Sequence, residues 1–304
     1  MLRLRNFIFL ACILTFIVIL MGAFTRLTDS GLGCPDWPLC YGNLTPITTV
    51  VHSTSKAWIE MIHRYLAFTL GLVILVLFIA TLIKKHHEIV LIAIASCALF
   101  TVVIQATLGM FTVTLQLHAL SVSLHLLFAF ILLALLTSWY IKFDPKNKLT
   151  NTGVFVGLFF LLIQVFLGAN VSATHSALVC PNLPLCPLTQ FNAHNLINMF
   201  SNIFQYGKLS STIERINLQM LHRLWGLILL CYFIGLTIYY HINSKTMIKR
   251  YSIAISVILI LQAIIGMMNV ALHNTLFTAL LHTTIATLLL IMMTYGLFLR
   301  VYNE

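Results

Sequence analysis

Four of the twelve histidines in this 304-residue chain recur at matched positions when the sequence is compared with itself. All four lie in apolar runs, where a histidine is costly unless it is hydrogen-bonded or binds a metal. A histidine pair is too few for a structural zinc site, which takes four ligands, but it can supply both axial ligands of a haem iron. The sequence therefore predicts two haem sites, formed by His63 with His125 and by His222 with His282. The alternative is that each histidine hydrogen-bonds to a neighbouring helix.

An acidic residue accompanies the first of these histidines but not its counterpart. Glu60 precedes His63 by three residues and so shares its helix face, whereas the matched position holds Gln219. Because a carboxylate at membrane depth is expensive and suggests function, Glu60 is the predicted catalytic residue. The alternative is an ion pair with Arg64 or Lys56 that anchors the helix.

Two further residue types fit a porphyrin. Arg64 and Arg223 directly follow the candidate ligands, and their guanidinium groups are predicted to neutralise haem propionates at the outer interface. Gly109 and Gly266 are expected to thin a helix face, so that a flat macrocycle approaches closely.

The composition shows which elements position these residues. Hydrophobic residues make up 60% of the chain and charged residues only 8%, against about 25% in soluble domains. The chain is therefore a polytopic membrane protein, and its basic residues are scattered over short loops, which excludes nucleic acid as a partner. Eight apolar runs reach the roughly 20 residues that a spanning helix needs. They are 7–26, 58–83, 89–113, 121–141, 153–172, 217–240, 251–271 and 277–299.

Lysine and arginine orient these spans. With the N-terminus inside, the inner segments hold eleven basic residues and the outer segments six, which predicts that both termini are cytoplasmic. The expected location is the plasma membrane of a bacterium, crossed many times. The four histidines then lie just below the outer surface.

Each of the two long outer loops holds a Cys-x5-Cys pair, Cys34 with Cys40 and Cys180 with Cys186. The outer side of such a membrane is oxidising, so two local disulfides are predicted. The alternative is four unpaired thiols.

The sequence contains an internal repeat that includes all of these features. Residues 22–40 align with 168–186 and share Cys-Pro-x-x-Pro-Leu-Cys, and the segments around the four histidines follow at nearly the same shift. The predicted fold is an all-α polytopic membrane protein whose eight transmembrane helices form two tandem four-helix-bundle repeats. The predicted halves are 1–148, with the first haem site, and 149–304, with the second.

These motifs together resemble the haem A synthase family. The resemblance rests on Glu60-x-x-His63-Arg64, the Gly-Cys-Pro-x-Trp-Pro-x-Cys-x-Gly loop at 33–42, the matched Gln-x-x-x-Gly segments and the other three histidines. It covers essentially the whole chain, in the variety of the family with cysteine pairs in both outer loops.

The resemblance implies a membrane oxidoreductase that converts the C8 methyl group of haem O to a formyl group. It does so by two successive hydroxylations and loss of water. By the same resemblance His63 and His125 hold the substrate haem O, His222 and His282 hold a haem b cofactor, and Glu60 is essential. The implied partners are haem O, a haem O synthase, an electron acceptor and the lipid bilayer.

Two other functions use the same residues. A di-haem electron-transfer or haem-carrier protein would need the histidine pairs, but it has no evident use for the difference between Glu60 and Gln219. A membrane thiol–disulfide oxidoreductase would use the cysteine pairs, although Cys-x5-Cys lacks the tight Cys-x-x-Cys spacing that lowers a thiol pKa.

Overall fold

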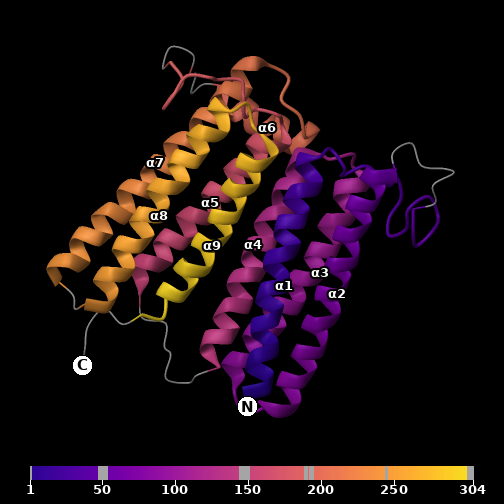
Figure 1. Cartoon of the computed structure of the whole chain (residues 1–304), viewed down its shortest axis with the longest axis vertical. Coiled ribbons are helices and arrows are strands. Elements are labelled where there is room, and N and C mark those ends of the chain that lie inside the picture. Colours follow the sequence, from indigo (N-terminus) through magenta and orange to yellow (C-terminus); the bar gives the residue numbers. More distant parts are fainter. Residues whose placement is uncertain are drawn as a thin grey trace. The chain divides into compact units, whose positions relative to one another are not determined.

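The computed structural model describes residues 2–46, 54–143, 151–187, 191, 195–243 and 246–299. Within these ranges it contains nine helices and no strand. Eight helices are long and apolar enough to cross a membrane, which confirms the predicted all-α membrane fold. They are α1 (Leu2–Leu27), α2 (Thr54–Lys84), α3 (Ile89–Thr114), α4 (Ala119–Lys142), α5 (Thr152–Ala173), α7 (Thr212–Asn243), α8 (Thr246–Ala271) and α9 (Leu276–Gly296) (Figure 1).

The ninth helix, α6 (Leu196–Tyr206), lies in the second long loop and was not predicted. It has only 11 residues, and polar side chains interrupt its sequence, so it forms no apolar run of spanning length. Helix α7 also begins five residues before the predicted run. Its first turn is polar and is fixed by a capping box: the Glu214 N–H donates to Ser211 Oγ, and the Ser211 N–H donates to the Glu214 carboxylate.

The helices pack into two compact units. Unit 1 comprises Met1–Leu117 and Phe128–Lys148, and unit 2 comprises His118–Leu127 and Leu149–Glu304. The predicted boundary after residue 148 falls in 144–150, outside the described residues.

The first turns of α4 belong to unit 2, whereas the sequence placed all of residues 1–148 in the first half. The Ala119 N–H donates to the carbonyl of Gly207, the residue that ends α6 in a left-handed conformation. The His118 ring lies against the same glycine, where an added Cβ would come within 2.4 Å of it. Leu120 packs against a cluster that includes Met199 and Ile203. A loop of the second half therefore holds this end of α4.

In unit 1 the packed core sits at one end of the helices. It joins the first half of α1, the second half of α2, the first half of α3 and the second half of α4. Leu4, Leu77, Leu91 and Trp139 are typical members. The opposite end, where α1 stops and α2 starts, carries His63 and the first disulfide loop.

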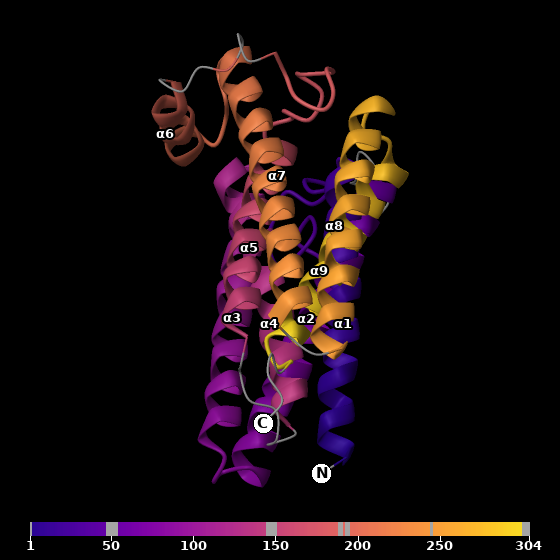
Figure 2. The same ribbon diagram turned by 90° about the vertical axis from the view of Figure 1, so that its left-hand side faces the viewer.

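In unit 2 helix α7 packs on α5 and α8, and α9 packs on α8 and α5 (Figure 2). Close packing is found where α5 begins, against the second half of α7. The Phe233 ring fills the space beside Gly157, and the Tyr240 hydroxyl donates to the Asn151 side chain. His222 and His282, near the starts of α7 and α9, lie toward the other end.

Candidate functional site

Unit 2 contains the better defined of the two histidine pairs. His222 on α7 and His282 on α9 belong to the same unit, and both imidazoles are half-buried. The Nδ1 atom of each ring is buried and has no hydrogen-bond partner within the described part of the chain. Since buried polar atoms are normally hydrogen-bonded or coordinated, these two nitrogens fit a role of the rings as metal ligands. His222 also meets the backbone of Gln164 on α5, so a hydrogen-bonding link between helices, the alternative that the sequence left open, is present for this ring.

Each ring of this pair lies against a glycine of a neighbouring helix. A Cβ added at Gly168 on α5 would come within 2.9 Å of His222 Cε1, and one at Gly266 on α8 within 3.1 Å of His282 Cε1. The space beside Gly266, which the sequence assigned to a macrocycle, is thus taken by an imidazole in this structure. The Gln262 amide donates to the His282 carbonyl over 3.0 Å and helps to fix this turn of α9.

The first-half histidines lie in different units. His63 is on α2 in unit 1, whereas His125 is in the turns of α4 that belong to unit 2. His63 nevertheless repeats the glycine contact of His222, because a Cβ at Gly22 on α1 would come within 3.0 Å of His63 Cε1. Sequence analysis missed the role of Gly22 and Gly168, although they are the first residues of the repeated segment. The pairing of His63 with His125 stays a prediction.

Glu60 is buried on α2, with 4% of its surface exposed. Its Oε2 atom accepts a hydrogen bond from the Cys34 N–H over 2.9 Å, and its Oε1 atom forms an ion pair with Arg64. The ion pair with Arg64 is the anchoring contact that the sequence left as an alternative to catalysis. In this structure Glu60 holds the first disulfide loop on α2.

Arg64 completes this attachment. Its Nη1 group donates to the carbonyls of Asp36 over 2.9 Å and Leu39 over 2.7 Å, while its Nη2 group meets Glu60. One guanidinium therefore links the buried carboxylate to the backbone of the loop. We call Glu60 and Arg64, with their loop contacts, the unit 1 clamp.

The second half has a similar attachment, with the amide of a glutamine in place of the carboxylate of Glu60. Arg223 donates from Nη1 to the Asn182 carbonyl over 2.7 Å and from Nη2 to the Cys180 carbonyl over 2.8 Å. Gln219 donates to the Ala177 carbonyl over 3.1 Å. We call Gln219 and Arg223, with these contacts, the unit 2 clamp. Both arginines thus use Nη donors on loop carbonyls, and their pairing with propionates stays a prediction.

Both predicted disulfides are present, Cys34–Cys40 and Cys180–Cys186. All four sulfur-bearing residues are at most 3% exposed. The first loop is pressed onto α2 so closely that a Cβ at Gly33 would lie 2.7 Å from backbone atoms. Because thiol–disulfide exchange requires access to the sulfur, this burial argues against an exchange catalyst.

Asp36 shapes the turn of the first loop. Its carboxylate accepts hydrogen bonds from the Tyr41 N–H over 2.6 Å and the Gly42 N–H over 2.7 Å. Desolvation alone would raise the pKa of Asp36, but these hydrogen bonds and the charge of Arg64 outweigh it and hold the pKa below its ordinary value.

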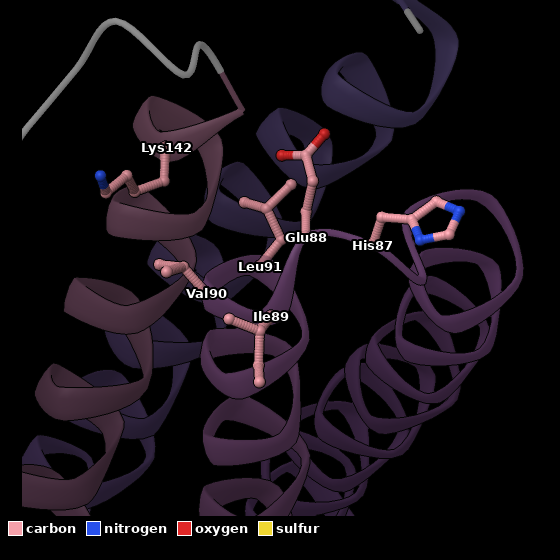
Figure 3. A pocket seen from close by; sticks show the side chains of 6 residues that line it. All are labelled: His87, Glu88, Ile89, Val90, Leu91 and Lys142. Carbon is pink, nitrogen blue, oxygen red and sulfur yellow. The ribbon is translucent and has the colours of Figure 1, made fainter.

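A pocket of about 280 Å³ lies at the far end of unit 1, around the turn between α2 and α3. Figure 3 shows that the side chains of His87 and Lys142 point away from one another. Glu88 forms an ion pair with Lys85, which does not line the pocket. Polar groups do not converge there, and none of the predicted site residues lines the pocket. The described residues also contain no group of three or more His, Cys, Asp or Glu side chains that could hold a metal ion by themselves. Iron bound by histidine pairs would therefore need a macrocycle.

Comparison with known proteins identifies the relatives of the chain. Residues 5–294 match the model of a family described as cytochrome oxidase assembly protein. A protein named heme A synthase from Shewanella oneidensis is 35% identical, over 92% of this chain and 91% of its own length. Proteins of the same name from Lysinibacillus sphaericus and Bacillus licheniformis are 29% and 28% identical, over 95% and 93% of this chain and 93% and 91% of their own lengths.

Proposed function

The chain belongs to the cytochrome oxidase assembly protein family that includes the haem A synthases, and we propose that it is a membrane oxidoreductase that converts haem O to haem A. The observation that carries this proposal is the His222–His282 pair, in which both Nδ1 atoms are buried and make no hydrogen bond within the described residues. The family relationship supplies the substrate.

The proposed reaction is a four-electron oxidation of the C8 methyl group. Each of two hydroxylations breaks a C–H bond of that carbon, forms a C–O bond to an oxygen supplied by water, and releases two electrons and two protons. The resulting geminal diol loses water to give the formyl group, without further oxidation. The electrons leave to an electron acceptor in the membrane, and the protons must be taken up near the methyl group.

His222 and His282 are the residues proposed to hold haem b. Gly168 and Gly266 set the positions of the two rings, and Gln262 holds the backbone at His282. When bound, haem b supplies one-electron transfer, which suits the removal of electrons from a substrate in the other half.

His63 and His125 are the residues proposed to hold haem O as substrate. The proposal is supported by the sequence repeat and by the matching contacts of Gly22 with His63 and of Gly168 with His222. By the charge distribution of the loops, both sites lie toward the outer face of a bacterial plasma membrane. A haem O synthase is the proposed partner that supplies the substrate.

Glu60 is proposed to accept a proton during the oxidation. Glu60 lies on the same helix as His63 and precedes it by three residues. The matched position in the second half holds Gln219, which carries no charge. Arg64 and the Cys34 N–H hold the two oxygens of Glu60 in place, which fixes the position of the group that would accept the proton.

Pigment extraction tests the proposed function. The full chain is expressed in cells that make haem O but not haem A, and the membrane haems are extracted and separated by chromatography. We expect a haem A peak that is absent without the chain. Retention of unchanged haem O by the purified protein would instead indicate the haem-carrier function.

A further inference from the structure

Helix α6 has a broader apolar surface than unit 2 covers. At about 100° per residue its apolar side chains occupy one continuous arc of about 160°. Its polar side chains fill much of the remainder. The apolar set is Leu196, Ile197, Met199, Phe200, Ile203 and Phe204, and the polar set is Asn198, Ser201, Asn202 and Gln205.

The protein buries only one edge of this arc. Met199 and Ile203 are at most 1% exposed and pack with Leu167, Val171 and Leu218 of α5 and α7. At the other edge Ile197 is 78% exposed and Phe204 is 56% exposed. The polar face is beyond these two residues, so an apolar strip separates the protein from the water-facing side of the helix.

The position of α6 is fixed with respect to two membrane-spanning helices. The side chain of Asn202 donates to the Glu214 carboxylate over 2.8 Å, and this bond ties α6 to the first turn of α7. Its partners Val171 and Leu218 lie near the end of α5 and the start of α7. Since α7 has 32 residues, about 48 Å of helix, it is longer than a hydrocarbon core of about 30 Å, so its first turns can extend into the headgroup layer.

The charges around α6 suit an anionic lipid surface. Lys208, directly after the helix, is exposed. Glu214 is the single acidic side chain in the described part of unit 2, and it is buried and bonded to Asn202 and Ser210. Phospholipid headgroups would therefore meet a cation and no exposed carboxylate.

We propose that α6 is an interfacial helix that lies in the headgroup layer of the membrane, with Ile197 and Phe204 inserted among the lipids and Ser201 and Gln205 in water. This arrangement explains why the apolar arc exceeds the area that the protein covers. Leu221 and Trp225, on either side of His222, pack against the cluster that α6 joins. The helix thus sets the membrane surface close to the level of His222.

Site-directed spin labelling tests this placement without reference to activity. Cysteine is introduced in the full chain by Ile197→Cys or Phe204→Cys, with Ser201→Cys and Gln205→Cys as matched controls on the polar face. The free cysteines at 12, 97 and 231 are first replaced by alanine. Each labelled chain is placed singly in nanodiscs of phosphatidylcholine and phosphatidylglycerol. Collision of the nitroxide with oxygen, which concentrates in lipid, is compared with collision with a water-soluble nickel chelate.

We expect the oxygen-to-nickel collision ratio to be several-fold higher at 197 and 204 than at 201 and 205. Equal ratios at all four positions would place the helix in water and overturn the proposal. Exclusion of both reagents at 197 and 204 would mean that protein covers this strip, and would also overturn it. Variants are compared only when they elute as a single species with both disulfides intact. Either of the two apolar positions suffices for the test.

Discussion

Each disulfide loop is held on its helix by an arginine at the matched position, but the two arginines have different partners. In the unit 1 clamp, Arg64 bridges loop carbonyls and the buried carboxylate of Glu60. In the unit 2 clamp, Arg223 bonds to loop carbonyls and to the sulfurs of the disulfide, with no carboxylate partner, and Gln219 makes a separate neutral bond to Ala177. A loop can therefore be held beside a histidine without an acid. The carboxylate of Glu60 exceeds what attachment requires, which favours a chemical role for it.

The largest expected effect concerns the histidines of unit 2. His222→Ala or His282→Ala should abolish the haem b absorption spectrum of the purified protein, because an axial ligand is lost. His241→Ala is the control, since that histidine lies exposed near the far end of α7. An unchanged spectrum in the first two variants would show that these residues are not the ligands.

Glu60→Gln separates the two clamps by chemistry. We expect this variant to retain bound haem but to stop the accumulation of haem A in cells that make haem O. The amide keeps an oxygen for the Cys34 N–H but cannot take up a proton. Glu88→Gln, at the start of α3, should not alter product formation. A normal amount of haem A in the Glu60 variant would show that this residue only holds the loop in place.

Removal of each arginine compares the clamps by stability. Arg64→Gln leaves a buried carboxylate without its cation, which should cost about 3–5 kcal/mol. Arg223→Gln loses charge-assisted hydrogen bonds to carbonyls but leaves no unpaired buried charge, and should cost about 1–3 kcal/mol. Thermal unfolding in detergent should therefore show a larger decrease in Tm for the first variant. Adding Glu60→Gln to Arg64→Gln should restore part of the lost stability. If Arg64→Gln and Arg223→Gln lower Tm equally, the expected difference between the clamps is wrong.

The glycine contacts allow a finer comparison. Gly168→Ala places a methyl group 2.9 Å from the His222 ring, so the ring must shift, and overpacking of this kind costs about 1–3 kcal/mol. The amount of haem b per protein should decrease. Gly22→Ala, against His63, should leave haem b unchanged, as should Gly235→Ala, which meets open space. Equal losses of haem b in all three variants would remove the distinction.

The smallest expected effect is a pH dependence confined to the first loop. The pKa of Asp36 is lower in the folded loop than in an unfolded chain, so its contribution is complete at neutral pH. That contribution should be lost as the pH falls below about 4, the ordinary range of this group. Hydrogen exchange at the Tyr41 and Gly42 amides, corrected for intrinsic rates, should then accelerate. The second loop has Asn182 at the matched position and should show no such change, nor should Asp36→Asn.

The sequence was sufficient for the membrane fold, because spans of about 20 apolar residues can satisfy their backbone only as helices in a bilayer. It also identified both disulfides, since paired cysteines six residues apart on an oxidising loop have a local partner. The four histidines emerged from the comparison of the chain with itself. These features depend on composition, local spacing and repetition, which are all properties of the sequence.

Tertiary structure decided the features that depend on contacts between distant segments. The sequence offered Arg64 to a propionate, but its donors reach carbonyls 25 and 28 residues away. It grouped all of α4 with the first half, yet Gly207 of the second half binds the start of that helix. It missed α6, because a short amphipathic helix in a long loop cannot be told from the loop itself until its buried side is known. In each case the partner is chosen by packing in three dimensions, which spacing along the chain does not specify.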